Sequence, residues 1–193
     1  MKKERFLRIN VGCGHEVIPS FVNLDLRRVR GSSLQADVLR LPFADGSVIE
    51  ARAGSVLEHF ADPCRVLDEL HRVLTPASTL IVRVPALGTN AAHLDPTHRY
   101  LADLEHWRQL LLLYFERVNL GSQGVKYRSN RLLVALQRSA IWLLGFHDLG
   151  QCWVLTATGK HRQPRLAPRP WWADSPQRQP TAMHAPPRER SWA

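Results

Sequence analysis

The sequence predicts an α/β fold, in which short apolar strands form a mostly parallel sheet, and three observations support this. An apolar run over residues 6–11 ends in Gly12-Cys13-Gly14. A second apolar run over residues 21–26 contains an acid, Asp25, near its end. Further short apolar runs alternate with helical periodicity over residues 34–115. A glycine turn after one strand and a carboxylate closing the next indicate a nucleotide site at the carboxyl edge of a parallel sheet.

The glycine turn differs from the dinucleotide-binding fingerprint. Gly12 and Gly14 tolerate positive φ and let a ligand lie against bare backbone. The fingerprint has a third glycine where this chain has Val17, and its acid follows about 20 residues on, whereas Asp25 follows Gly14 after about 11. So short a crossover leaves no full helix N-terminus for a pyrophosphate. NAD, and with it a nucleotide-dependent oxidoreductase, is therefore disfavoured.

Six segments follow one another over about half of the chain: Asn10 to Gly14, Phe21 to Leu26, Ala36 to Gly46, Val56 to Phe60, Leu70 to Pro76 and Leu80 to Pro85. In these segments and their order the chain resembles the class I S-adenosylmethionine-dependent methyltransferases, in particular the short branch called type 11. S-adenosyl-L-methionine is a nucleoside ligand that carries no phosphate. The resemblance implies a Rossmann-like doubly wound sheet, mostly parallel with an antiparallel last strand, and an enzyme that methylates a small-molecule or sugar-containing acceptor.

The predicted cofactor site combines the glycine turn with two carboxylates. Asp25 is placed to accept hydrogen bonds from ribose hydroxyls. The resemblance implies that Asp37 holds the adenine amino group, and apolar residues beside it can cover the ring. The alternative for Asp37 is a turn cap. The predicted cofactor-binding residues are Asn10, Val11, Gly12, Cys13, Gly14, Asp25, Leu26, Asp37, Val38, Leu39, Ser55 and Leu57.

A polar cluster, residues 93–100, follows the strand predicted over residues 80–84. Ligands bind in the crevice at the carboxyl ends of such strands, so we expect the cluster to line the acceptor pocket. His98, then His59 and Asp95, are the candidates for a general base that takes a proton from a hydroxyl acceptor. Two alternatives stay open: the Asp-Pro segment caps the next helix, and His59 is structural.

No metal is expected. A metal site made by His93, Asp95 and His98 is disfavoured, because one turn of loop rarely supplies closed coordination by itself.

The remaining elements are predicted from periodicity and turn residues. A brief strand covers residues 34–37, and the strand over 48–55 is unusually polar for a buried parallel strand. Asp62 and Pro63 suit the start of a helix. The other predicted elements are helices over 62–74, 103–115 and 132–144, a strand over 117–120, and a strand over 151–157 that the resemblance places antiparallel beside the 80–84 strand.

The chain divides into a predicted methyltransferase domain, residues 1–160, and a tail, residues 161–193, that is rich in proline and arginine and expected to be disordered. The apolar helix over 132–144 is too short to span a bilayer. Core packing is its expected role, and an interfacial or homodimer face is the alternative.

Charge and composition bear on the partners and the compartment of the protein. The net charge of +9 is scattered rather than gathered in runs, and six arginines lie in residues 161–193, so a nucleic-acid partner is disfavoured. We find no membrane span and no signal peptide. Three cysteines with neither disulfide nor zinc spacing fit a reducing, cytoplasmic compartment.

A competing hypothesis is a non-catalytic module that binds S-adenosylmethionine and has lost transfer. About five residues precede the first strand, which leaves no room for an N-terminal helix over the pocket, and the strand over 48–55 matches the family poorly.

Overall fold

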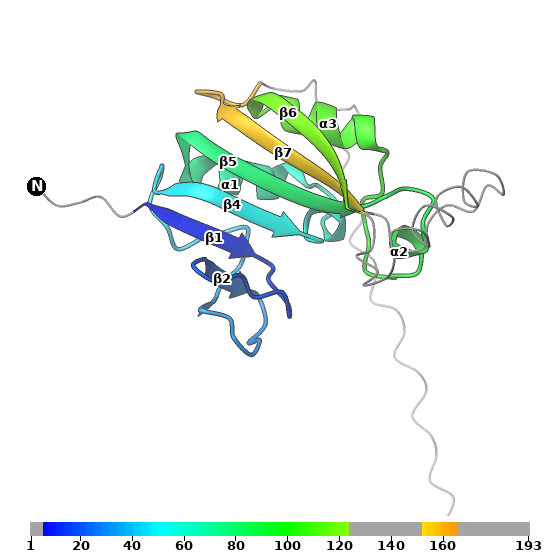
Figure 1. Ribbon diagram of the computed structural model, residues 1–193, viewed down its shortest axis with the longest axis horizontal. Coiled ribbons are helices and arrows are strands. Elements are labelled where there is room, and N and C mark those ends of the chain that lie inside the picture. The colour runs from blue at the N-terminus through cyan, green and yellow to red at the C-terminus, as the bar shows by residue number, and fades with distance from the viewer. Residues whose placement is uncertain (1–5, 124–151, 166–193) are drawn as a thin grey trace, which may run out of the picture.

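A computed structural model describes residues 6–123 and 152–165, which form a seven-stranded sheet in the order β3-β2-β1-β4-β5-β7-β6 (Figure 1). Strands β1 to β5 pair in parallel, and β7 is antiparallel to both β5 and β6. The mostly parallel sheet with an antiparallel final strand beside β5 is thereby confirmed. The strands are β1 Leu7–Val11, β2 Val22–Asp25, β3 Leu34–Gln35, β4 Val48–Gly54, β5 Leu74–Pro85, β6 Phe115–Gln123 and β7 Cys152–Lys160; the helices are η1 Leu57–His59, α1 Cys64–Val73, α2 Asn90–His93 and α3 Leu104–Leu112.

The carboxyl ends of the parallel strands lie at one edge of the sheet, toward which the arrows of β1 and β4 point in Figure 1. Parallel pairing of Ile9 with Val22 and with Ala51 brings the ends of β1, β2 and β4 level. The short helix η1 follows β4, and α2 follows β5, at this edge. Ligands bind at this edge in open α/β sheets.

The core lies on one side of the sheet. Helices α1 and α3 both lie behind the sheet in Figure 1. Residues Ala51 and Ala53 of β4 face these helices and are fully buried. No helix within 6–123 or 152–165 covers the near face, and there Glu50 of β4 pairs with Arg8 at 3.2 Å and with Arg52 at 3.0 Å. The unusual polarity of this strand therefore follows from one-sided burial, and its predicted range is confirmed to within one residue.

Helix α1 is shorter than predicted, and β5 is longer. The helix begins at Cys64, whose amide donates to the side chain of Asp62 at 3.0 Å, so Asp62 still satisfies a helix N-terminal donor. The chain passes directly from Val73 into β5, instead of forming a separate turn before residue 80. The register of β4 against β5 shifts at the start of β5, and proline is tolerated in a strand at such irregularities, which explains how Pro76 fits.

Helix α3 is also shorter than the predicted 103–115. Asp103 caps it by accepting from the His106 amide at 2.7 Å, and the helix ends at Leu112 because the chain enters β6 at Phe115. Strand β6 accordingly extends beyond the predicted 117–120. Residues 161–165 hydrogen-bond to the segment between α3 and β6, and the predicted helix over 132–144 and residues 166–193 of the tail lie outside the described residues.

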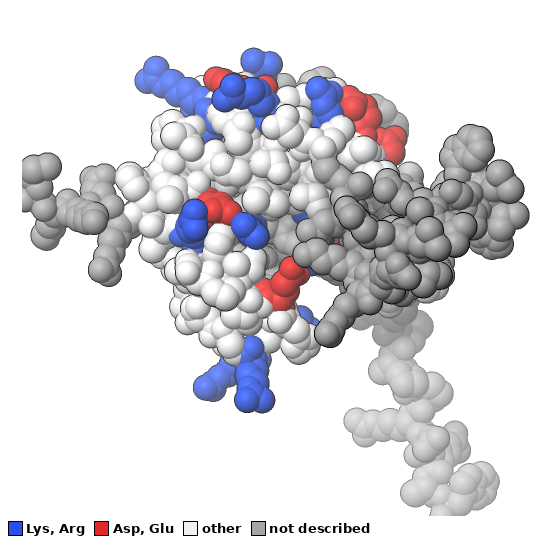
Figure 2. All heavy atoms as spheres, viewed as in Figure 1, with Lys and Arg blue, Asp and Glu red and all other residues white. Residues whose placement is uncertain are grey.

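On the face shown in Figure 2, basic side chains are separated by uncharged surface and by acidic groups. This face carries no continuous basic stripe, as the scattered charge of the sequence predicts. None of the helices in the described part of the chain is long and apolar enough to cross a membrane.

Candidate cofactor and acceptor site

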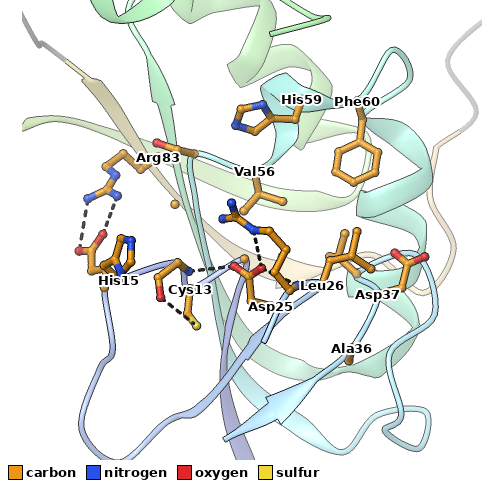
Figure 3. A pocket seen from close by; sticks show the side chains of 17 residues that line it. Cys13, His15, Asp25, Leu26, Ala36, Asp37, Val56, His59, Phe60 and Arg83 are labelled. Atoms are coloured by element: carbon orange, nitrogen blue, oxygen red, sulfur yellow. Dashed lines mark hydrogen bonds and ion pairs between the residues drawn. The ribbon is translucent and has the colours of Figure 1, made fainter. Parts of the chain in front are cut away.

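A cavity of about 470 Å³ opens at the carboxyl edge of the sheet (Figure 3). Its size falls within the range of ordinary ligand pockets, about 300–1,000 Å³. Arg83 and His15 lie at one end, and Asp37 and Phe60 lie at the other. The lining residues are Gly12, Cys13, Gly14, His15, Glu16, Asp25, Leu26, Arg27, Ala36, Asp37, Val38, Gly54, Ser55, Val56, His59, Phe60 and Arg83.

The glycine turn after β1 needs both of its glycines, for different reasons. Gly12 has φ +59°, and a Cβ added there would lie 2.5 Å from Cγ2 of Val56. Gly14 has φ +48°, and a Cβ there would meet no protein atom within 4 Å. The first glycine therefore permits close packing, whereas the second leaves bare backbone facing open space in the cavity.

Asp25, the last residue of β2, presents a buried carboxylate to the cavity. Its Oδ2 accepts from the Gly14 amide at 2.9 Å, and its Oδ1 accepts from the Arg27 amide at 2.9 Å. Burial alone would raise the pKa of Asp25, but these hydrogen bonds and the Arg27 guanidinium outweigh it and hold the pKa below its usual value. Asp25 is therefore an ionised acceptor at neutral pH.

Asp37 lies at the opposite end of the cavity from Arg83. Its Oδ1 accepts from the Leu39 amide at 2.9 Å, which is the turn cap that the sequence left open. The residue also lines the cavity beside Val38 and Phe60, so the carboxylate adjoins apolar surface. A turn cap that occupies Oδ1 leaves Oδ2 as an acceptor.

Glu16 and Arg83 form an ion pair at the other end. The Arg83 guanidinium donates to the two carboxylate oxygens of Glu16 at 2.6 and 3.3 Å (Figure 3). Arg83 belongs to β5 and also accepts from the Ser55 amide through its carbonyl, at 2.8 Å. Ser55 has φ +55°, a strained left-handed conformation of the kind that gathers at functional sites. Glu16 and Arg83 were not predicted from the sequence, because pairing between residues so far apart leaves no local pattern.

The predicted histidines lie together, with His59 in the cavity lining and His98 beside it. The rings of His59 and His98 are 5.0 Å apart between centroids. His98 Nδ1 contacts the Ala92 carbonyl at 2.9 Å, so this nitrogen carries the proton. Thr97 donates its hydroxyl proton to Asp95 and can therefore only accept from His59 Nδ1, at 3.0 Å. Both histidines consequently carry their lone pair on Nε2 when neutral, and that nitrogen of His98 lies 3.8 Å from Oδ2 of Asp95.

Glu58 adjoins the two histidines and was not predicted. Its side chain is 1% exposed, and neither carboxylate oxygen has a hydrogen-bond partner among the described residues. Burial raises the pKa of Glu58 above its usual value, and the nearby His59 and His98 offset this only in part. The carbonyl of Glu58 accepts from the amides of Arg99 and Tyr100 at 2.8 and 3.0 Å, which fixes the loop of His98 against η1.

Comparison with known proteins agrees with this geometry. Residues 9–82 match the family model described as a methyltransferase domain. This match covers less than half of the chain, and these residues are similar to a methyltransferase domain. Solved structures that share the fold include proteins named as S-adenosylmethionine-dependent methyltransferases.

Two solved methyltransferases illustrate the shared fold. A S-adenosylmethionine-dependent methyltransferase from Archaeoglobus fulgidus is 18% identical at a TM-score of 0.57, over 80% of this chain and 87% of that one. Phosphoethanolamine N-methyltransferase 2 from Haemonchus contortus, in complex with S-adenosyl-L-methionine, is 12% identical at a TM-score of 0.53, over 83% of this chain and 50% of that one.

One curated protein matches in sequence over a short stretch. An uncharacterized 37.1 kDa protein of transposon TN4556 from Streptomyces fradiae is 45% identical over 49 residues. This match covers 25% of the present chain and 14% of the relative.

The described fold brings most of the predicted cofactor residues to the cavity. Gly12, Cys13, Gly14, Asp25, Leu26, Asp37, Val38 and Ser55 line it. The other four do not. Val11 and Leu57 are fully buried core residues, Leu39 packs against the core, and the Asn10 side chain braces the turn by donating to Glu16 O at 2.8 Å and to Asn23 at 3.0 Å.

The cavity fits S-adenosylmethionine in three respects. The ionised Asp25 offers acceptor oxygens to ribose hydroxyls. The Cβ position of Gly14 is open, so a ligand can approach its backbone. Asp37 joins a carboxylate to the apolar surface of Val38 and Phe60, as an adenine ring with its exocyclic amine requires.

Proposed function

We propose that this chain transfers a methyl group from S-adenosylmethionine to a small-molecule or sugar-containing acceptor. The observation that carries the proposal is the ionised Asp25 carboxylate beside the open backbone of Gly14, inside one cavity. When bound, S-adenosylmethionine supplies an electrophilic methyl group on a positively charged sulfur. Holding donor and acceptor in near-attack geometry can contribute about 7–11 kcal/mol to such a displacement.

Different residues of the chain bind different parts of the donor. Asp25 accepts from the ribose, and Asp37 accepts from the adenine amino group. The ion pair of Glu16 with Arg83 presents both signs of charge to the amino-acid end of the donor, which is a zwitterion. These assignments follow the length of the cavity from Arg83 to Asp37 (Figure 3).

We assign deprotonation of the acceptor to His59 and His98. His98 and His59 each hold Nδ1–H toward a fixed oxygen and keep Nε2 free to take a proton. Asp95 acts through Thr97 to orient His59 and is itself exposed. A positioned base of this kind contributes typically 10²–10⁴-fold to rate.

Calorimetric titration with S-adenosylmethionine tests the donor site. Replacing Asp25 by Asn removes the charge that attracts the ribose hydroxyls, so we expect a loss of about 1.5–3 kcal/mol, or roughly 10- to 150-fold in affinity. Asp45→Asn is the matched control, because Asp45 is exposed and lies outside the cavity. Equal affinity in wild type and Asp25→Asn would contradict the proposal.

A radiolabelled-methyl assay on cell extract tests transfer itself. The expected product is a labelled small molecule, formed more slowly by His98→Ala and His59→Ala at unchanged donor affinity. Donor binding with no labelled product would instead favour the non-catalytic module. Labelled nucleic acid would overturn the choice of acceptor.

We further propose a cytoplasmic setting, in which Cys13, Cys64 and Cys152 stay as thiols, as they are in the structure. A homodimer is the one assembly that the sequence suggested, through the apolar segment over residues 132–144. Light scattering of the full chain measures its mass directly.

A further inference from the structure

Glu58 is a buried carboxylate that the proposed transfer does not use. It is 1% exposed, and both of its oxygens lack a hydrogen-bond partner within the described ranges 6–123 and 152–165. A buried charge normally has a partner or coordinates a metal, because the cost of leaving it alone is several kcal/mol. Its side chain is therefore the part of the site that most requires an explanation.

Two imidazoles lie beside this carboxylate. One ligand atom from each of Glu58, His59 and His98 lies within 4.8 Å of the other two. Bonds to zinc are about 2.0–2.2 Å long, so ligands in a tetrahedral site lie about 3.3 Å apart. The three ligand atoms must therefore come closer together to bind such an ion.

Both imidazoles are already oriented as metal ligands are. A histidine that binds a metal generally donates its other ring N–H to a carbonyl or carboxylate, which fixes its tautomer. His98 donates Nδ1–H to the Ala92 carbonyl, and His59 donates Nδ1–H to Thr97, which in turn donates to Asp95. The Nε2 lone pairs that remain are the ones a metal takes.

We propose that Glu58, His59 and His98 form a binding site for a divalent transition-metal ion of the zinc type. Two imidazoles and one carboxylate favour such an ion over Mg²⁺ or Ca²⁺, which prefer oxygen ligands alone. Three protein ligands leave coordination positions open, as in catalytic zinc sites. The site differs from the one considered in the sequence analysis, since His93 is not part of it and Glu58 replaces Asp95.

The position of the site gives it a role, and this step rests on the proposed function. His59 lines the cofactor cavity, so an ion held there has an open position facing the acceptor. An acceptor hydroxyl would occupy that position and would give its proton to water more readily as its oxygen bonds to the methyl carbon, because a bound cation lowers the pKa of a coordinated hydroxyl. With the ion bound, His59 and His98 serve as its ligands; in the metal-free chain they are the bases assigned above.

Metal titration tests the site without donor or acceptor. The full chain is stripped with EDTA and dialysed, then titrated with Co²⁺ and followed by visible absorption, with Zn²⁺ as competitor. We expect one equivalent of Co²⁺ to bind, Zn²⁺ to displace it and Mg²⁺ not to. Glu58→Gln and His98→Ala should each weaken binding at least 100-fold, and Thr97→Val about 10- to 100-fold, since Thr97 only orients His59.

His93→Ala is the matched control, because His93 is exposed, precedes the same loop and is not in the cluster, so it should bind Co²⁺ like the wild type. Thermal melting adds a second measurement: Zn²⁺ should raise the melting temperature of the wild type but not of Glu58→Gln. Absence of a one-equivalent Co²⁺ complex, or one that survives in both Glu58→Gln and His98→Ala, would overturn the proposal. Donor affinity measured in EDTA reports separately on the proposed function.

Discussion

Gly12 and Gly46 share a left-handed backbone but differ in what surrounds them. Gly12 has φ +59°, and an added Cβ would lie 2.5 Å from Cγ2 of Val56. Gly46 has φ +62°, and an added Cβ would meet nothing within 4 Å. Comparing an alanine substitution at each position therefore separates the stability lost to backbone strain from the stability lost to a steric clash.

We expect Gly46→Ala to lower the free energy of unfolding by about 1–2 kcal/mol through backbone strain alone. Gly12→Ala should lower it by about 2–5 kcal/mol, since overpacking adds about 1–3 kcal/mol. Urea unfolding measures both. The double variant Gly12→Ala, Val56→Ala removes the clashing methyl and should be less destabilised than the sum of its single changes. Equal losses for the two glycines would contradict the packing role of Gly12.

Single residues of the site were predictable to the extent that they follow a local pattern. Asp25 was predicted, because a carboxylate that closes the strand after a glycine turn is visible in the sequence. Val11 and Leu57 were also predicted to bind the cofactor, but their side chains are buried in the core and do not line the cavity, because the sequence does not show which way a side chain points. Glu58 was missed for a related reason: an acid in a sequence gives no sign of being buried without a partner.

Helix α1 and the loop between β3 and β4 are joined through Arg72. Its guanidinium donates to the carbonyls of Leu41 and Phe43 at 3.0 and 2.9 Å, and to the carboxylates of Glu69 and Asp45 at 2.7 and 2.6 Å. Such a planar fork binds several oxygens at once, whereas an ammonium group cannot reproduce the geometry. The Leu41 amide also donates to Glu69 at 2.6 Å, so the Arg72 and Glu69 side chains together hold the loop over the helix.

We expect Arg72→Lys to lower the free energy of unfolding by about 2 kcal/mol, because the two carbonyls lose charge-assisted hydrogen bonds while the charge stays. Arg65→Lys, at an exposed position of the same helix, should change it by less than about 0.5 kcal/mol. Chemical denaturation of both variants provides the comparison. If Arg72→Lys proved as stable as the control, the loop would hold itself in place without the guanidinium.

At this scale the sequence predicted the order and type of the elements better than their ends. Periodicity revealed α1 and α3, but the chain passes straight from α1 into β5 and reaches β6 only two residues after α3, and neither Leu113 nor Tyr114 is a typical turn residue. The polarity of β4 made it a poor match to a buried parallel strand. It is explained only once the fold shows that helices cover one face of the sheet and leave the other face to polar side chains. That is a property of the assembled fold.

The end of β7 meets helix α1 at His71. Its Nε2 contacts the carbonyl of His161, just after β7, at 2.9 Å, and Lys160 donates to the carbonyl of Leu74 at 2.7 Å. Burial lowers the pKa of His71, although the His161 carbonyl partly opposes this. The folded protein therefore favours the neutral imidazole.

Because folding lowers the pKa of His71, the free energy of unfolding depends on pH. With the folded pKa of His71 below its usual 6.5, the stabilisation is present in full above that pH and is lost as the pH falls through the folded pKa. We expect the free energy of unfolding to decrease between pH 8 and pH 5 more steeply in the wild type than in His71→Gln. His93→Gln, an exposed control, should follow the wild type. Parallel slopes for wild type and His71→Gln would exclude the contribution.

The position of β7 in the sheet affects how the chain folds during synthesis. Strands β5 and β6 leave the ribosome well before β7, yet β7 lies between them and supplies every strand pairing of β6 in the described sheet. Until residue 160 is synthesised, the nascent chain exposes the unpaired edge of its longest strand, a template for wrong association. Slow synthesis, or truncation before Cys152, would therefore leave a chain that depends on chaperones rather than a smaller working enzyme.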